Sequence, residues 1–164
     1  DTFAGAEQKD TVLILVSPDG ETRAVADNLS FPNGMVITPD AKTLIVGESR
    51  ASRLTAFDIG HDGTLSNRRV WAEIEGVPDG IALDEDGCIW VASPANSVFL
   101  RVAEGGEIKD KIESDLKAIA CALGGSDRRT LFMLEAKEAR PPGLKRGNAR
   151  IRYTQVQVAG TGIP

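Results

Sequence analysis

Short apolar runs separated by polar turns follow one another along the whole chain. Pairs such as Asp19-Gly20, Asp62-Gly63 and Asp86-Gly87 divide the runs, and Asp-Gly between apolar runs is typical of a hairpin turn. The best helical candidate, residues 112–123, has polar residues at positions that a helix would bury. The pattern therefore predicts an all-β chain. The expected strands cover residues 12–16, 22–26, 35–38, 43–47, 54–58, 69–73, 81–84, 88–92, 98–102, 108–112, 119–123, 130–135 and 151–158.

The strands recur in a longer unit. Asp40, Asp86 and Asp127 each precede a strongly apolar run, and they are 46 and 41 residues apart. Four strands in about 40 to 50 residues are typical of one β-propeller blade. The second run of each unit is apolar at consecutive positions, which indicates a strand covered on both faces by neighbouring blades. A β-sandwich with a similar number of strands is the alternative, and the repeat favours the propeller.

The units give an incomplete ring. Residues 11–27 supply two strands, two complete units follow, and the last unit supplies three strands. Residues 1–164 are therefore interpreted as a single half-ring domain of about three four-stranded blades. Propellers use about four to eight blades, and an open arc would expose blade faces and strand edges. We expect upstream sequence or another chain to complete the ring.

A short motif occurs twice, as Phe31-Pro32-Asn33-Gly34-Met35 and as Val77-Pro78-Asp79-Gly80-Ile81. One interpretation is a simple turn, in which Pro sets φ and Gly follows without strain. Both copies, however, come just before the innermost strand of a unit, at the end that faces the central channel. The side-chain oxygens of Asn33 and Asp79 suit a divalent cation, and a carboxylate can also act as a general base. Both interpretations remain open on the residues alone.

Charge and composition exclude several classes of function. The net charge of −5 argues against a nucleic-acid partner, and no apolar run approaches the roughly 18 residues that would predict a membrane span. The basic pairs Arg68-Arg69, Arg128-Arg129 and Lys145-Arg146 are interpreted as solvated turn residues.

The cysteines and the histidine limit the kinds of catalytic and metal site that the chain can form. Cys88 and Cys121 lie in apolar runs without CxxC spacing. Buried free thiols are favoured over a disulfide, which fits a reducing compartment and predicts a cytoplasmic protein. The sole histidine, His61, lies in a Gly-His-Asp-Gly turn, which argues against a catalytic triad and against a His-rich zinc site.

Several segments together resemble the gluconolactonase/regucalcin (senescence marker protein) family. The segments, which cover nearly the whole chain in order, are residues 29–35, 39–44, 62–70, 78–84, 87–92, 124–132 and the tail 158–164. The resemblance implies a six-bladed propeller with one calcium or zinc ion in its channel, and hydrolysis of sugar lactones or related esters. It also implies that Asn33 is a metal ligand and that Asp79 is both a metal ligand and the general base.

The resemblance covers only the C-terminal half of the family. The family's first metal ligand is a Glu in the opening blade, and Glu7 lacks the context of that ligand. The third copy of the motif, residues 116–119, offers no oxygen ligand. We therefore expect metal-dependent hydrolysis of a sugar lactone or similar ester only where a second chain completes the ring. That chain would be either a second copy, in a homodimer that gathers two Asn33 and two Asp79 side chains, or a complementary N-terminal half. The alternative is a truncated, non-enzymatic half-propeller that acts as a binding or interaction scaffold.

Overall fold

The computed structural model describes residues 7, 9–138 and 148–162. Their regular structure is entirely β, in thirteen strands. Each expected strand is present with shifted ends, and the prediction of an all-β chain is confirmed. The strands are β1 (Thr11–Val16), β2 (Thr22–Leu29), β3 (Pro32–Ile37), β4 (Thr43–Glu48), β5 (Arg53–Ile59), β6 (Leu65–Glu73), β7 (Ile81–Leu83), β8 (Ile89–Ser93), β9 (Val98–Val102), β10 (Ile108–Glu113), β11 (Lys117–Gly124), β12 (Thr130–Ala136) and β13 (Ala149–Gln155).

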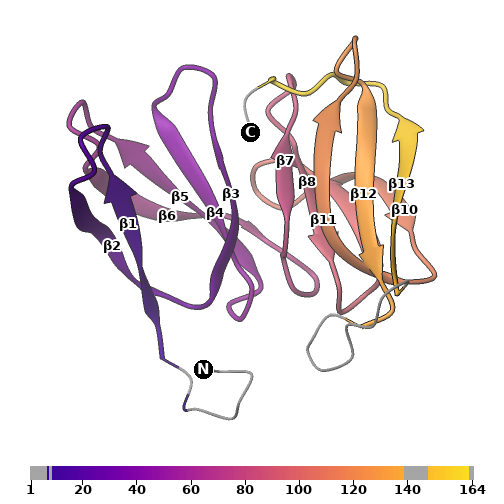
Figure 1. Cartoon of the computed structure of the whole chain (residues 1–164), viewed down its shortest axis with the longest axis horizontal. Coiled ribbons are helices and arrows are strands. Elements are labelled where there is room, and N and C mark those ends of the chain that lie inside the picture. The colour runs from indigo at the N-terminus through magenta and orange to yellow at the C-terminus, as the bar shows by residue number, and fades with distance from the viewer. Residues whose placement is uncertain (1–6, 8, 139–147, 163–164) are drawn as a thin grey trace.

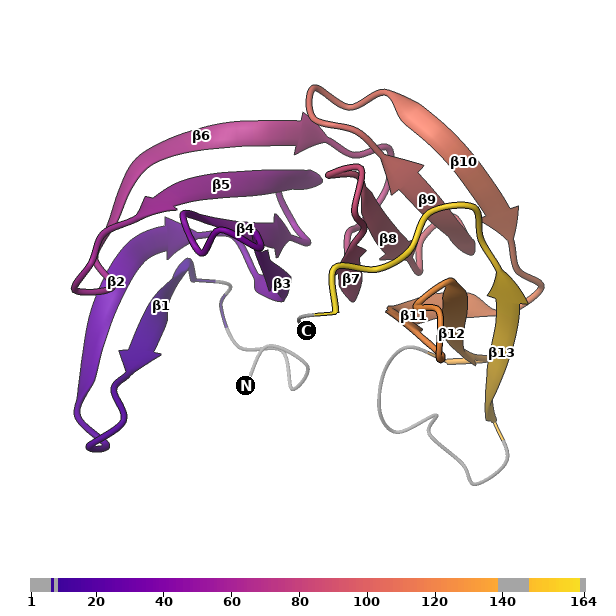
Figure 2. The same cartoon turned by 90° about the horizontal axis from the view of Figure 1, so that it is seen from above.

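The strands form four antiparallel sheets that stand side by side along an arc (Figures 1 and 2). Two sheets are complete blades, β3-β4-β5-β6 and β7-β8-β9-β10. The sheet β11-β12-β13 has three strands and β1-β2 has two. In the complete blades the first strand lies on the inner side of the arc and the fourth on its outer rim (Figure 2). The predicted propeller architecture and the count of strands in each unit are therefore confirmed.

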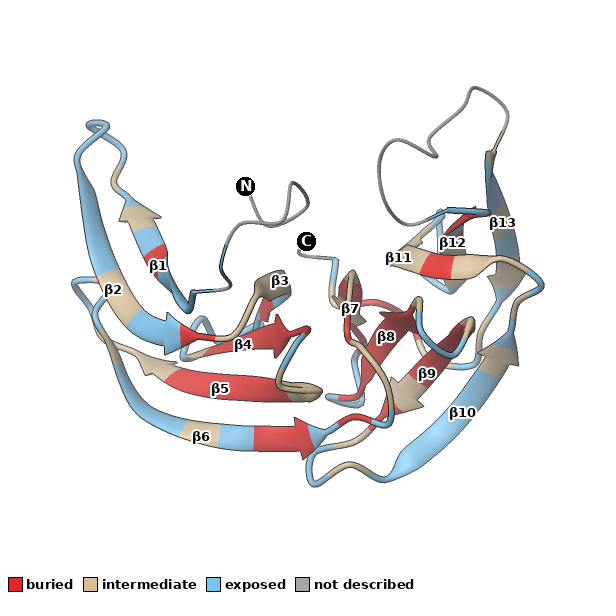
Figure 3. Cartoon of the chain, turned by 90° about the horizontal axis from the view of Figure 1, so that it is seen from below, coloured by how far each residue is buried: buried red, intermediate tan, exposed pale blue. Residues whose placement is uncertain are grey.

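The hydrophobic core lies between blades rather than inside a single sheet. Ile45, Trp71, Ile89 and Leu100 belong to one cluster, which joins the two complete blades. Trp90, Phe99, Leu131 and Met133 belong to the next cluster, which joins the second complete blade to β11-β12-β13. Because β4 and β8 are covered on both faces, they are buried at nearly every position (Figure 3). This explains why the second run of each unit is apolar at consecutive positions.

Gly34 and Gly80 bring the inner strands of successive blades into contact. The Gly34 N–H donates to the Asp79 carbonyl oxygen at 3.0 Å, and the Gly80 N–H donates to the Ile119 carbonyl oxygen at 3.0 Å. A Cβ on Gly34 would lie 2.6 Å from the Asp79 carbonyl oxygen, and one on Gly80 would lie 2.6 Å from the Ala120 Cα. Neither glycine has a positive φ, so the two residues serve close approach rather than turn geometry.

The interpretation of the repeated motif as a turn is therefore wrong. Pro32, Asn33 and Gly34 lie inside β3, with an irregularity in pairing between Pro32 and Met35. The second copy, residues 78–80, has no regular structure, bends at Gly80 and leads directly into β7. The backbone reverses earlier, near Phe31, which has a φ of 59°.

In three sheets, a buried side chain at or near the end of the second strand forms a hydrogen bond with the segment that leads into the innermost strand. Glu48 accepts a hydrogen bond from the Ser30 N–H at 2.7 Å, and Ser93 Oγ accepts one from the Val77 N–H at 3.2 Å. The equivalent residue in the last sheet, Glu135, is hydrogen-bonded by the Ser114 side chain. The same position in three sheets thus anchors the segment that arrives from the preceding blade.

The buried carboxylates among these anchors are neutralised by arginines. Glu48 pairs with Arg53 at 3.0 Å and with Arg68 at 3.1 Å, and Glu135 pairs with Arg150 and Arg152. Burial alone would raise the pKa of Glu48, but hydrogen bonds from Ser30, Thr55 and Arg53 outweigh burial and hold the pKa below its usual value.

The basic pairs were therefore misinterpreted in part as solvated turn residues. Arg68 and Arg69 lie within β6, where Arg68 pairs with Glu48 and Arg69 with Asp58. Arg128 lies in a turn and pairs with Glu85. The third pair, residues 145–146, lies outside the described residues.

The segment after β13 crosses back to the neighbouring blade, where Gly160 bridges to Asp84 and the Glu85 N–H donates to the Ala159 carbonyl oxygen at 2.8 Å.

In the part of the chain that the structure describes, no helix is long and apolar enough to cross a membrane.

The close approach of the inner strands makes a first prediction. Gly80→Ala places a methyl group against the backbone of Ala120, which cannot move aside without shifting a strand. We expect a loss of about 1–3 kcal/mol in the free energy of unfolding, measured by urea denaturation. Gly47→Ala is the matched control, because a Cβ there is 3.4 Å from its nearest neighbour, Pro78 Cβ. Equal losses in the two variants would contradict the role assigned to Gly80.

The buried anchor makes a second prediction. Glu48→Gln removes the charge that Arg53 and Arg68 neutralise, and we expect it to cost about 1.5–3 kcal/mol of unfolding free energy at pH 7. Because the pKa of Glu48 is lowered in the folded state, its stabilisation exists above the unfolded-state pKa and is lost as pH falls through the folded-state pKa. The deficit should therefore shrink in acid. Glu85→Gln, which breaks a solvent-exposed pair with Arg128, should have little effect at any pH.

Candidate functional site

Asn33 and Asp79 meet at the contact between the first two inner strands. Asn33 lies near the start of β3, and Asp79 lies two residues before β7. The two side chains are hydrogen-bonded to each other, and the backbone bond from Gly34 to Asp79 runs beside them. The inner strands β3, β7 and β11 border the concave side of the arc (Figure 2). The structure therefore brings together the two residues that the sequence singled out.

Ser49 joins these two residues in a small polar network. Its hydroxyl donates to the Pro78 carbonyl oxygen at 2.6 Å, and the Asn33 amide nitrogen lies 3.4 Å from the same hydroxyl. Ser49 is buried, and its own N–H donates to the Phe31 carbonyl oxygen at 3.0 Å. Ser49 thus fixes both segments that carry the pair. A lone serine after a strand carries no distinguishing pattern, so Ser49 could not be singled out from the sequence.

The surroundings of Asp79 make its carboxyl easier to protonate than an exposed one. Burial raises the pKa of the Asp79 carboxyl above its usual value, and the hydrogen bond from Asn33 opposes this shift without cancelling it. None of the ion pairs formed by residues 7, 9–138 and 148–162 involves Asp79. A half-buried carboxylate without a cationic partner is available to accept a proton or to bind a cation.

The third inner strand adds no oxygen to this pair. Gly80 bonds to Ile119 as Gly34 bonds to Asp79, so Ile119 occupies in its sheet the place that Asp79 occupies in the preceding blade. An aliphatic side chain at this position neither ligates a cation nor transfers a proton. The polar group is therefore confined to the contact between β3 and the segment before β7.

The donor set fits part of a site for a hard divalent cation. The Asn33 amide nitrogen donates to its neighbours, and the amide oxygen on the same group and the Asp79 carboxylate are the candidate ligands. Calcium takes about six to eight oxygen ligands, so this pair would supply only some of them. Within the described residues, no three His, Cys, Asp or Glu side chains form a metal-binding cluster.

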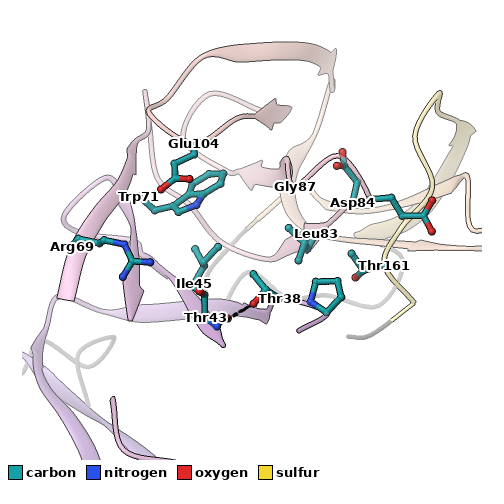
Figure 4. A pocket seen from close by; sticks show the side chains of 12 residues that line it. Thr38, Thr43, Ile45, Arg69, Trp71, Leu83, Asp84, Gly87, Glu104 and Thr161 are labelled. Atoms are coloured by element: carbon teal, nitrogen blue, oxygen red, sulfur yellow. Dashed lines mark hydrogen bonds between the residues drawn. The ribbon is translucent and has the colours of Figure 1, made fainter. Parts of the chain in front are cut away.

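A separate cavity of about 520 Å³ lies between the two complete blades. This cavity lies near the end of β3 that is opposite to Asn33, since Thr38 lines it and neither Asn33 nor Asp79 does. Figure 4 shows Trp71 and Glu104 on one wall and Arg69 on another. This cavity is thus not the place where the candidate ligands meet, and the candidate site is the contact between Asn33 and Asp79.

The two cysteines are poorly suited to nucleophilic chemistry. Both are free and buried, as the sequence predicts. Burial raises the pKa of the Cys121 thiol to about 12, and its sulfur lies 3.4 Å from the Trp90 carbonyl oxygen. A thiol that stays protonated at neutral pH is a poor nucleophile.

Comparison with known proteins agrees with this architecture. The family model described as SMP-30/Gluconolactonase/LRE-like region matches residues 2–137. A 6-deoxy-6-sulfogluconolactonase from Pseudomonas putida is 27% identical over 133 residues, which are 78% of this chain and 46% of the relative. Regucalcin from Danio rerio is 29% identical over 133 residues, which are 77% of this chain and 45% of the relative. The chain therefore spans less than half the length of these curated relatives.

A solved structure shares the fold. The calcium-binding protein regucalcin from Agrobacterium tumefaciens superposes with a TM-score of 0.77 and 21% identity, covering 93% of this chain and 55% of that one. The order of strands, the blades and the match over residues 2–137 lead to one conclusion: the chain belongs to the SMP-30/gluconolactonase/LRE-like family.

Proposed function

We propose that this chain supplies part of the active site of a metal-assisted lactonase, which hydrolyses a sugar lactone or similar ester once a second chain segment completes the propeller. The observation that carries the proposal is the contact between Asn33 and Asp79 across two neighbouring inner strands. Family membership supports lactone hydrolysis as the reaction class. Because the chain spans less than half of its relatives, the activity belongs to the completed propeller.

Asp79 is the general base in this proposal. Hydrolysis adds water across the ester bond: the water oxygen bonds to the carbonyl carbon, and the bond from that carbon to the ring oxygen breaks. Asp79 accepts the proton of the attacking water, and the proton passes to the ring oxygen as that oxygen leaves. The product is the open hydroxy acid. A carboxylate whose pKa is raised by burial accepts a proton more readily than an exposed one.

In this proposal Asn33 orients Asp79 and would bind the same cation. The amide nitrogen holds the carboxylate in place, and the amide oxygen and carboxylate would together bind calcium or zinc. When bound, the cation supplies polarisation of the lactone carbonyl and stabilises the negative charge that develops on its oxygen. Ser49 has a positioning role, because its hydrogen bonds to the Pro78 carbonyl and to Asn33 hold the two segments that carry Asn33 and Asp79 in place.

A non-enzymatic scaffold is the second candidate. The observation that favours it is Ile119, because an aliphatic side chain stands where a third ligand would extend the pair. On this alternative the blades retain their packing and present a surface to a partner. Absence of turnover in the completed protein, with and without metal, would favour the scaffold.

The catalytic proposal predicts the effect of removing the base. In the completed protein, Asp79→Asn should reduce gluconolactone hydrolysis by about 10²–10⁴-fold, and chelation of calcium and zinc should abolish turnover of the parent protein. Asp110→Asn is the matched control, because Asp110 is an exposed carboxylate on β10, away from the inner strands. Turnover that survives both Asp79→Asn and chelation would contradict the proposal.

The same base sets the pH dependence. Hydrolysis requires ionised Asp79, so the rate should rise with pH through the pKa of this group. Because burial raises that pKa in the metal-free protein, the midpoint of an NMR titration of the Asp79 carboxyl without metal should lie above 3.8, the ordinary value for an aspartic acid. A bound cation favours the ionised form, so the rate of the metal-loaded protein should level off at a lower pH than this midpoint. A metal-free midpoint at or below the ordinary value would contradict the assignment.

A further inference from the structure

The cavity between the two complete blades has the properties of a ligand site of its own. Its volume of about 520 Å³ lies within the range of about 300–1,000 Å³ that is usual for small-molecule sites. Its lining includes residues of the turn between β3 and β4, of β6, of the turns that follow β7 and β9, and of the segment after β13. A ligand held there would be separate from Asn33 and Asp79, which do not line the cavity.

Backbone hydrogen bonds hold the walls of this cavity in place. The Gly105 N–H donates to the Trp71 carbonyl oxygen at 2.8 Å, which fixes the turn that carries Glu104 to the strand that carries Trp71 (Figure 4). At another wall, the Thr161 N–H donates to the Leu83 carbonyl oxygen at 3.3 Å. The lining side chains therefore come from segments that are bonded to one another, and the cavity is preformed.

One wall of the cavity is apolar and partly aromatic. Trp71 lines it although only 6% of this residue is exposed, and Ile45 and Leu83 lie on the same cavity. Such a surface favours a ligand with an apolar face that can lie against the indole. The carboxylate of Glu104, beside Trp71, adds a hydrogen-bond acceptor at the edge of that surface (Figure 4).

The hydroxyl group of Thr161 points to a ligand that forms hydrogen bonds. Its oxygen is buried and, among the residues that the structure describes, it has no hydrogen-bond partner. A buried hydroxyl without a partner costs free energy, because it has lost its bonds to water. Since Thr161 lines the cavity, rotation about its Cα–Cβ bond would offer this hydroxyl to a ligand and remove the cost.

The carboxylates of the cavity disfavour an anionic ligand. Asp84, Glu85 and Glu104 line it. Asp84 pairs with Arg101 at 2.7 Å, and Glu85 pairs with Arg128 at 2.7 Å. Glu104 takes part in none of the ion pairs within residues 7, 9–138 and 148–162. An anion would therefore be repelled by a charge that no guanidinium offsets.

Arg69, on a different wall from Glu104, disfavours a cationic ligand. A cation would be attracted by the indole of Trp71 and by Glu104, but the guanidinium of Arg69 would repel it. In the described part of the chain, the bonds from Arg69 to Asp58 at 2.7 Å and to the Asn67 carbonyl oxygen at 3.1 Å both use Nη1, and its other N–H groups are donors for a ligand. An acceptor on one wall and a donor on another suit hydroxyl groups, which both donate and accept.

We propose that this cavity binds a neutral polyhydroxylated ligand of the size of a monosaccharide. The ligand lies with its C–H face against Trp71, and its hydroxyl groups bond to Glu104, Arg69 and Thr161. The proposal does not depend on lactonase activity, since neither Asn33 nor Asp79 takes part in it.

The first test titrates this chain with methyl β-D-glucopyranoside, a neutral ring with hydroxyl groups at its edge, and follows the N–H signals by NMR. We expect saturable shifts of the Gly105 amide and of the Trp71 indole, with a Kd of about 1 mM. The indole of Trp90, which is buried in the neighbouring cluster, should not shift. Methyl β-D-glucuronide, the same ring with a carboxylate, should bind about tenfold more weakly, and so should tetramethylammonium.

The second test repeats the titration with Glu104→Ala, which should weaken binding by about tenfold because a charged acceptor is lost. Glu107→Ala is the matched control: Glu107 is exposed near the same turn, pairs with Lys109 and does not line the cavity. Both side chains are exposed, so neither variant should impair folding.

Three results would overturn the proposal. The first is a glucoside titration without saturable shifts, or one in which tetramethylammonium binds more tightly than the glucoside. The second is an equal affinity of Glu104→Ala and Glu107→Ala. The third is a set of shifts at Asn33 and Asp79 instead of at Gly105 and Trp71, which would place the sugar in the proposed lactonase site. Loss of lactonase activity in Asp79→Asn bears only on the proposed function, so the two proposals can fail separately.

Discussion

The close contact between inner strands of successive blades is the constraint on which the rest of the structure depends. Gly34 and Gly80 lack the Cβ that would collide with the next blade, and each N–H donates to a carbonyl oxygen across that contact. This spacing lets the clusters around Trp71 and Trp90 close between blades. It also places the residue before Gly34 beside the residue before Gly80, and these residues are Asn33 and Asp79.

The candidate site thus follows from the repetition of the blades. A residue at one position of a repeat meets the same position of the next repeat, so a polar pair needs no special loop. The buried anchors Glu48 and Ser93 hold the segments that enter each inner strand, and Ser49 ties the two segments to each other. Burial then raises the pKa of Asp79 without an ion pair to offset it. Packing and candidate chemistry therefore have the same structural origin.

Much of this could be predicted from the sequence, because strand alternation and the spacing of Asp40, Asp86 and Asp127 are local signals. They give the strands and the blades. The motif that occurs twice gives Asn33 and Asp79 as candidates, and only the family resemblance implies their roles. The rest depends on contacts between segments distant in the chain. The composition of Pro-Asn-Gly left a simple turn open as one of two interpretations, because the neighbour that requires Gly34 lies 45 residues further along the chain, at Asp79. Arg68 was interpreted as solvated for the same reason, because its partner Glu48 lies on another strand.

The central claim is that neighbouring blades bring Asn33 and Asp79 into one polar group. The most direct test is a pH titration of the Asp79 carboxyl carbon by NMR, in the parent protein and in Asn33→Ala. We expect a parent midpoint above 3.8, and a midpoint that moves still higher in the variant, because Asn33 donates to the ionised form. A parent midpoint at or below the ordinary value, or a midpoint that Asn33→Ala leaves in place, would contradict it.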